Sequence, residues 1–144
     1  MRPRRDQGVR SQPPRWVTPR SRPRVLVEYA DDAVRGHLLR GLRLRGYDAL
    51  GCPGPDARAT CPLLHDRPCP AVAEADAVVT GLVARPPGRA IATIIHALAP
   101  DRPLIAEGTQ LMLHGLDERL QATPAFPLEV DEVADALDAT LATR

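Results

Sequence analysis

The hydrophobic positions of this chain follow two periods, one typical of buried strands and the other of helices. Apolar runs such as residues 25–29 show little polar alternation, which is the pattern of a strand covered on both faces. Val34, Leu38 and Leu42 instead repeat at the spacing of an amphipathic helix. Strands are predicted at residues 25–29, 47–50, 76–81, 103–106 and 123–126. Helices are predicted at residues 32–45, 89–99, 109–120 and 130–141.

The ends of these segments carry residues that start and stop helices. Asp31 or Asp32 can cap the first helix, and Gly46 follows its last turn in the manner of a C-cap. Acidic residues stand in the first turn of the last helix, where negative charge is favoured. The order of strands and helices predicts an α/β fold, with a five-stranded parallel sheet and helices on both faces.

One segment interrupts this alternation. Residues 52–70 lie where a second helix is expected, between the second and third strands, yet they contain five prolines. Proline removes a backbone donor and clashes with the preceding turn of a helix, so a long helix is not expected there. We therefore predict that a Cys/Pro-rich loop replaces the second helix.

Composition separates a tail from the body of the chain. Residues 1–23 are rich in arginine and proline, and apart from Met1 their only large apolar side chain is Trp16. Such a segment cannot bury enough apolar surface to offset its ordering entropy. Residues 1–23 are therefore predicted as a disordered tail. Trp16 is expected to be exposed, with packing on the body or on a partner as the alternative. Residues 24–144 are predicted as one α/β domain, which has a suitable size for a single core.

The sequence also indicates where the protein is located and which kinds of partner it could have. No apolar run has the length of a membrane span, and the N-terminus lacks the apolar region of a secretory signal. We expect a cytoplasmic protein with no membrane partner, and nucleic acid as a partner only through the Arg-rich tail. In that compartment the three cysteines are expected as free thiols or metal ligands.

Several short segments resemble, in the same order, the receiver domains of bacterial response regulators. They correspond to the first strand, the end of the first helix, the strand before the phosphoacceptor, the turn after it, the fourth strand and the start of the last helix. They read Val-Leu-Val (25–27), Arg-Gly-Tyr (45–47), Asp-Ala-Val-Val (76–79), Pro-Pro-Gly (86–88), Pro-Leu-Ile (103–105) and Phe-Pro-Leu (126–128). The resemblance covers about residues 24–143 and implies a flavodoxin-like fold and a role in signal transduction.

The resemblance also implies where phosphorylation chemistry would lie. A receiver needs an acidic pair for Mg²⁺, an acceptor aspartate, a switch hydroxyl and a lysine. In this chain the acidic pair falls on Ala30 and Asp31, and the acceptor position falls on Gly81. The switch position is Gly108, the lysine position is Phe126, and the chain contains no lysine. We therefore expect that the phosphoacceptor site has been lost.

The loop at residues 52–70 holds every cysteine of the chain, and a proline follows each one. With His65 the cysteines form the pattern C-x8-C-x3-H-x3-C, which makes Cys52, Cys61, His65 and Cys69 candidate metal ligands. Zinc favours four N or S ligands, and an iron–sulfur cluster can combine three cysteines with His65 or with an outside ligand. Two of the thiols could instead form a redox switch, or all three could simply be packed.

Two hypotheses of different classes follow. The first is a non-catalytic, receiver-like regulatory domain that acts through contacts with a regulatory protein partner, with association of two copies as a homodimer left open. The second is a metal-binding or thiol redox-sensing domain that uses the loop at residues 52–70. Neither hypothesis assigns a catalytic residue, and we expect no enzymatic activity.

Overall fold

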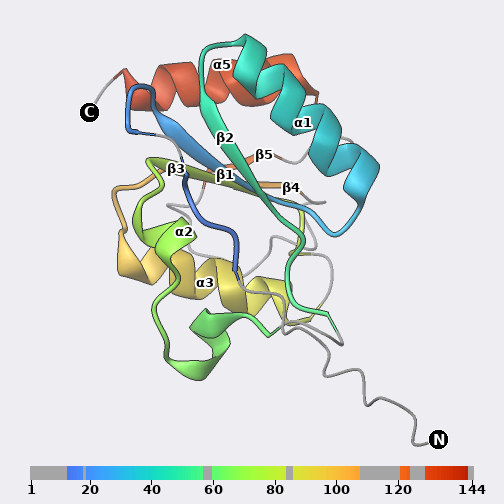
Figure 1. The fold of residues 1–144 in the computed structure, drawn as a ribbon, viewed down its shortest axis with the longest axis vertical. Helices are drawn as coiled ribbons and strands as arrows, with labels where there is room; N and C mark the ends of the chain where they lie inside the picture. The colour runs from blue at the N-terminus through green and yellow to red at the C-terminus, as the bar shows by residue number, and fades with distance from the viewer. Residues whose placement is uncertain are drawn as a thin grey trace, which may run out of the picture.

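A five-stranded parallel sheet in the order β2-β1-β3-β4-β5 forms the centre of the domain (Figure 1). The computed structural model describes residues 13–17, 19–56, 60–83, 86–107, 121–123 and 129–142. The strands are β1 (Arg24–Glu28), β2 (Asp48–Cys52), β3 (Ala77–Thr80), β4 (Leu104–Glu107) and β5 (Gln121–Thr123). This order is that of a flavodoxin-like, doubly wound sheet, so the predicted fold class is confirmed.

Helices cover both faces of this sheet. They are α1 (Asp32–Leu44), the 3₁₀ turn η1 (Pro62–His65), α2 (Pro70–Ala73), α3 (Gly88–Leu98) and α5 (Val130–Leu141). Figure 1 shows α1 and α5 on one face and α2 and α3 on the other. Side chains alternate along β1, so Val25 and Val27 pack in the core with α1 and α5, and Leu26 packs in the core with α3. None of the described helices is long and apolar enough to cross a membrane.

Helix α1 has the ends that the sequence predicts. The Asp31 side chain is its N-cap and accepts hydrogen bonds from the N–H groups of Ala33 and Val34 at 2.8 and 3.0 Å. After the helix, Gly46 adopts a φ of +95°, a left-handed conformation that glycine takes without a steric penalty. This turn leads the chain directly into β2.

The segment between β2 and β3 contains two single helical turns in place of a long helix. Turn η1 begins at Pro62 and α2 begins at Pro70. Proline is well tolerated in the first turn because the N–H that it lacks has no helical partner there. The prediction that no long helix forms here is therefore confirmed, but the segment is not a plain loop, because it contains these two helical turns.

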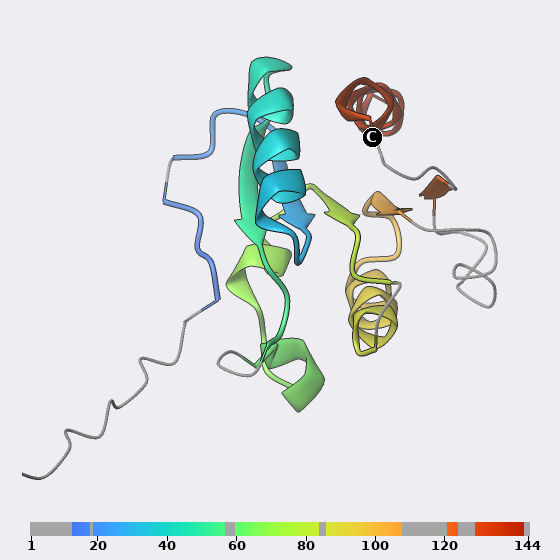
Figure 2. The same ribbon diagram turned by 90° about the vertical axis from the view of Figure 1, so that its right-hand side faces the viewer.

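Residues 13–17 and 19–23, which we name the N-terminal strap, run along the outside of the domain toward β1 (Figure 2). The prediction that Trp16 is exposed is wrong. Its indole Nε1 donates a hydrogen bond to the Ala71 carbonyl at 3.0 Å, and the Arg24 guanidinium carbon lies 5.2 Å from the centroid of its ring. Arg20 adds a salt bridge to Asp76 at 2.9 Å. The prediction missed these contacts because it was based on the low average hydrophobicity of the segment. The contacts come from only two side chains, one aromatic ring and one arginine.

Two predicted segments differ from the structure or lie outside its described part. The predicted strand at residues 123–126 is β5, but the structure has it two residues earlier, at Gln121–Thr123. Residues 124–126 of that prediction are not among the described residues. The predicted helix at residues 109–120 also lies outside them.

Replacing the strap's aromatic anchor should destabilise the whole domain. Trp16→Ala removes the packing of the ring, its hydrogen bond to Ala71 and its contact with Arg24. We expect the free energy of unfolding to fall by about 2 kcal/mol, less than for a fully buried Trp because this ring is only half-buried. Urea unfolding at fixed pH measures this change in the free energy of unfolding. Val17→Ala is the matched control, since Val17 is 89% exposed. Equal stability of the two variants would contradict an anchoring role.

Candidate functional site

The carboxyl ends of the parallel strands meet at one edge of the sheet and carry two candidate sites. Side chains alternate along a strand, so Glu28, the last residue of β1, and Tyr29, the residue after it, point to opposite faces. Glu28 shares a cavity with Leu26 and with Ile91 of α3, whereas Tyr29 packs in the core with α1 and α5. Each face of this edge therefore presents its own set of polar groups.

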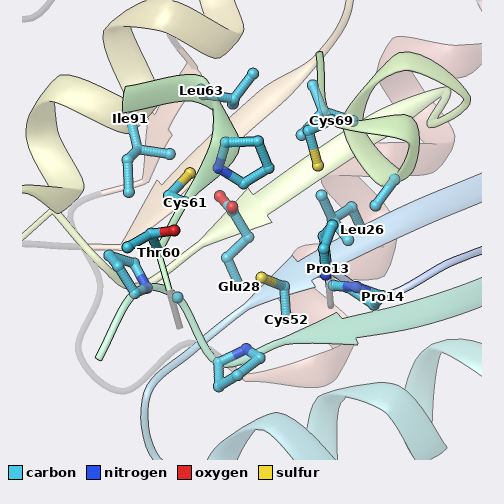
Figure 3. Close-up of a pocket in the computed structure, with 16 residues that line it drawn as sticks. Pro13, Pro14, Leu26, Glu28, Cys52, Thr60, Cys61, Leu63, Cys69 and Ile91 are labelled. Atoms are coloured by element: carbon cyan, nitrogen blue, oxygen red, sulfur yellow. The ribbon is translucent and has the colours of Figure 1, made fainter. Parts of the chain in front are cut away.

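The first site, which we name the thiol pocket, is lined by Glu28, Cys52, Cys61 and Cys69 and has a volume of about 110 Å³. Figure 3 shows the three sulfur atoms arranged around the Glu28 carboxyl group. The remaining walls are mostly apolar side chains of the sheet, of η1, α2 and α3, together with five prolines. These prolines are Pro13, Pro14, Pro53, Pro55 and Pro62. Thiols and one carboxyl group are thus the main polar groups that face this cavity.

Glu28 is the acidic group that this pocket buries. The residue is 4% exposed, and its Oε1 atom has no hydrogen-bond partner in the structure. Burial raises the pKa of Glu28 from 4.5 to about 7, although a hydrogen bond from Thr80 and the charge of Arg102 oppose the shift. A buried carboxyl oxygen without a partner is costly in an apolar cavity. Glu28 therefore marks a position where a bound cation or hydrogen-bond donor would be stabilised.

The three cysteines reach the pocket from three different elements. Cys52 is the last residue of β2 and pairs in register with Glu28. Cys61 and Cys69 stand at the N-cap positions of η1 and α2, directly before the prolines that begin those turns. The two Cys-Pro pairs therefore have a structural reason, because each proline starts a helical turn and leaves the cysteine before it at the pocket wall.

Two of these thiols are held in the neutral form. Burial raises the pKa of Cys52 to about 12, and the negative charge of Glu28 acts in the same direction. Burial also raises the pKa of Cys61, against hydrogen bonds from backbone N–H groups of η1. A thiol with a raised pKa is a weak nucleophile near neutral pH. The pocket is therefore poorly suited to thiol–disulfide exchange near neutral pH.

His65 lies apart from the other predicted ligands. It is exposed at the end of η1 and does not line the thiol pocket. Over the described residues, no three His, Cys, Asp or Glu side chains are grouped so that they could hold a metal ion. The structure brings Cys52, Cys61 and Cys69 to one cavity and adds Glu28, which the sequence places at the end of the first strand but which was not among the predicted ligands. A charged residue inside the apolar run of β1 was the signal that could have identified it.

The second site, which we name the Tyr29 cleft, has a volume of about 630 Å³ and is lined by Tyr29, Asp31, Gly81 and Glu107 among others. The Tyr29 hydroxyl donates a hydrogen bond to Oε2 of buried Glu107 at 2.7 Å. The Tyr29 ring lies against Gly81, where an added Cβ would be 2.2 Å from Tyr29 Cε1. Burial and the nearby Glu107 carboxylate raise the pKa of Tyr29, so its hydroxyl stays protonated.

The receiver resemblance assigns several positions to phosphorylation. In this structure these positions lack the expected side chain, have another structural role, or lie outside the described residues. Gly81 has no side chain, and the Asp31 carboxylate caps α1. Thr80 hydrogen-bonds to Glu28 on the opposite face of the sheet from the Tyr29 cleft. The switch position Gly108 and the lysine position Phe126 lie outside the described residues.

Burial of Glu28 should make the protein less stable as pH rises. The pKa of Glu28 is 4.5 without burial and about 7 in the fold, so between these values the folded chain binds the extra proton. Its contribution is fully retained below about pH 4.5, and we expect about 3 kcal/mol to be lost once the pH exceeds 7. Glu28→Gln should remove this loss, measured by urea unfolding of both proteins from pH 5 to 8. If the free energy of unfolding changed with pH in the same way in both proteins, the prediction would be refuted.

Comparison with solved structures identifies the fold, whereas protein-family models and curated protein sequences gave no match. A response regulator receiver domain protein from Clostridium thermocellum has a TM-score of 0.64 at 13% identity, over 84% of this chain and 95% of that chain. A Burkholderia thailandensis protein named for pilus assembly, CpaE, has a TM-score of 0.63 at 19% identity, over 83% and 98% of the two chains. A Thermotoga maritima response regulator has a TM-score of 0.60 at 11% identity, over 84% and 98%. This chain therefore has the fold of a receiver domain, as the sequence resemblance implied.

Proposed function

We propose that this chain is a cytoplasmic regulatory domain of the receiver type, which acts by contact with a regulatory protein and accepts no phosphoryl group. The observation that carries the proposal is the packing of the Tyr29 ring against Gly81. That glycine occupies the position at which the receiver resemblance implies an acceptor aspartate. A side chain that fills this position from the residue after β1 leaves neither the carboxylate nor the space that phosphoryl transfer requires.

The neighbouring groups support the same conclusion. Mg²⁺ is bound through carboxylate oxygens that remain free to coordinate it. The Asp31 carboxylate already accepts two backbone hydrogen bonds as the cap of α1. The Glu107 carboxylate accepts the hydroxyl of Tyr29 at 2.7 Å. Among the described residues that line the Tyr29 cleft, Asp31 and Glu107 thus each have a structural role, and Gly81 adds no carboxylate to them.

A role in protein contact is supported by the fold and by exposed apolar side chains. The similar solved structures from Clostridium thermocellum and Thermotoga maritima are named as a response regulator receiver domain and a response regulator. In this chain Leu44, at the end of α1, is 90% exposed, and Leu98, at the end of α3, is 62% exposed. Large exposed apolar side chains at helix ends offer contact area that a partner protein could bury.

The absence of phosphoryl transfer can be tested by direct labelling. We expect no phosphoryl incorporation when the full chain is incubated with acetyl phosphate and Mg²⁺ and its intact mass is measured. The reason is that Gly81 provides no carboxylate and Tyr29 closes the space above it. A receiver domain with an intact acceptor aspartate is the positive control in the same buffer. A stoichiometric label that hydroxylamine removes would overturn the proposal, and its loss in Asp31→Asn would identify the acceptor.

The contact between Tyr29 and Gly81 can be tested by a double-mutant cycle. Gly81→Ala should lower the free energy of unfolding by about 3 kcal/mol, because its Cβ would lie 2.2 Å from the Tyr29 ring. In a Tyr29→Ala background the same change should cost less than about 1 kcal/mol, measured by urea unfolding. Gly36→Ala in α1 is the matched control, because its Cβ would meet only the flexible Arg40 end at 3.3 Å. Identical costs in the two backgrounds would show that the ring does not occupy this space.

A further inference from the structure

The lining of the thiol pocket is typical of a site for a small organic ligand. Its walls are mostly apolar, and the Glu28 carboxyl group projects into it (Figure 3). We propose that the thiol pocket binds a small, uncharged and mostly apolar molecule whose single hydroxyl group donates a hydrogen bond to Oε1 of Glu28. This inference goes beyond the regulatory role proposed above and does not depend on it.

The Glu28 carboxyl group provides a hydrogen-bond acceptor inside the cavity. Glu28 is 4% exposed, and its Oε1 atom has no hydrogen-bond partner, although Thr80 hydrogen-bonds to the same carboxyl group. A water molecule at Oε1 would need about two to four polar partners. Besides Glu28, the described side chains of the lining offer thiols, which are weak hydrogen-bonding groups, and the Thr60 hydroxyl. A ligand with one donor and an apolar body matches this lining better than water does.

The volume of the cavity limits the size of the ligand. An apolar cavity of about 150 Å³ holds a benzene-sized molecule. The thiol pocket has about 110 Å³, so it is suited to a molecule of up to about six non-hydrogen atoms. Of the residues that line the pocket, Pro53 and Thr60 are exposed. The cavity is therefore partly open to solvent, and a ligand can enter beside these two residues.

The charges around the pocket favour an uncharged ligand over an amine. Burial raises the pKa of Cys52 and of Cys61, so both thiols stay neutral near pH 7. The buried guanidinium of Arg102 already acts on Glu28 through its charge. An alkylammonium group has three N–H donors, and two of them would face mostly apolar walls at a cost in desolvation. A hydroxyl group has one donor, which the free Oε1 atom of Glu28 accepts.

The proline-rich wall makes the cavity a preformed site. Prolines from the N-terminal strap, from the segment after β2 and from the start of η1 line it, and the ring of each one fixes its backbone φ. A rigid wall loses little conformational entropy when a ligand binds. The sulfur atoms of Cys52, Cys61 and Cys69 are polarisable and pack well against an apolar ligand.

Titration of the full, isotope-labelled chain with cyclopentanol, followed by amide chemical shifts in NMR spectra, tests the proposal. We expect saturable shifts at the amides of Glu28, Cys52, Cys61 and Cys69, with a Kd of roughly 1 mM or below. Cyclopentanone has the same ring and one oxygen atom but no donor. It should bind at least roughly tenfold more weakly at pH 8, where the Glu28 carboxyl group can only accept because its pKa is about 7.

Two variants remove either the acceptor or the space. Glu28→Met keeps the length of the side chain without its carboxyl oxygens, and should weaken cyclopentanol binding at least roughly tenfold. Cys61→Leu adds volume at the wall of the cavity and should abolish saturable binding. His65→Leu, the matched control at the other end of η1, should bind cyclopentanol as the unchanged chain does, because His65 is exposed and lies outside the pocket. Circular dichroism and thermal unfolding establish that each variant is folded.

Three results would overturn the proposal. The first is a set of shifts that does not saturate or that lies away from the pocket. The second is equal affinity for cyclopentanol in the unchanged chain and in folded Glu28→Met, which would exclude Glu28 as the acceptor. The third is tighter binding of cyclopentylamine than of cyclopentanol, which would show that the pocket takes a cation. None of these results bears on phosphoryl labelling, so failure of this inference and failure of the proposed function remain distinguishable.

Discussion

Strand β1 is the element on which both candidate sites depend, because it pairs with β2 on one side and with β3 on the other. Its register sets Glu28 opposite Cys52 on β2 and opposite Thr80 on β3. A shift of one residue would exchange Glu28 and Tyr29 between the two faces of the sheet. The buried side chains of Val25, Leu26 and Val27 prevent that shift, since they fill two different cores. Burial of β1 therefore determines which polar side chains lie on each face of the sheet.

The two faces use their acidic groups in opposite ways. In the Tyr29 cleft, Glu107 accepts the hydroxyl of Tyr29, and the ring covers Gly81, so the polar groups satisfy one another. In the thiol pocket, the Oε1 atom of Glu28 remains without a partner beside three sulfur atoms. Native structures leave few buried polar atoms unsatisfied, and those that remain often mark functional positions. At this edge of the sheet, the buried oxygen without a hydrogen-bond partner thus lies on the face that α2 and α3 cover.

The sequence was sufficient for the framework of the fold but not for the composition of the site. Strands such as β1 and β3 are continuous apolar runs, and α1 carries both a cap at Asp31 and a glycine stop at Gly46, so local signals were enough. Glu28 was harder to identify, because its role depends on register with Cys52 and on burial by distant segments. Trp16 was misjudged for the same reason, since its partner Ala71 is far away in the chain. Periodicity reports local structure, whereas these contacts are long-range.

The prolines link the altered second helix to the pocket. A regular helix between β2 and β3 would present only every third or fourth side chain to the sheet. Two separate turns that begin at Pro62 and Pro70 instead leave Cys61 and Cys69 at their N-caps, where both line one cavity with Cys52. Prolines from the N-terminal strap also line this cavity, and the strap is anchored on α2, the turn that follows Cys69. The strap and the pocket wall therefore share α2 as a common support.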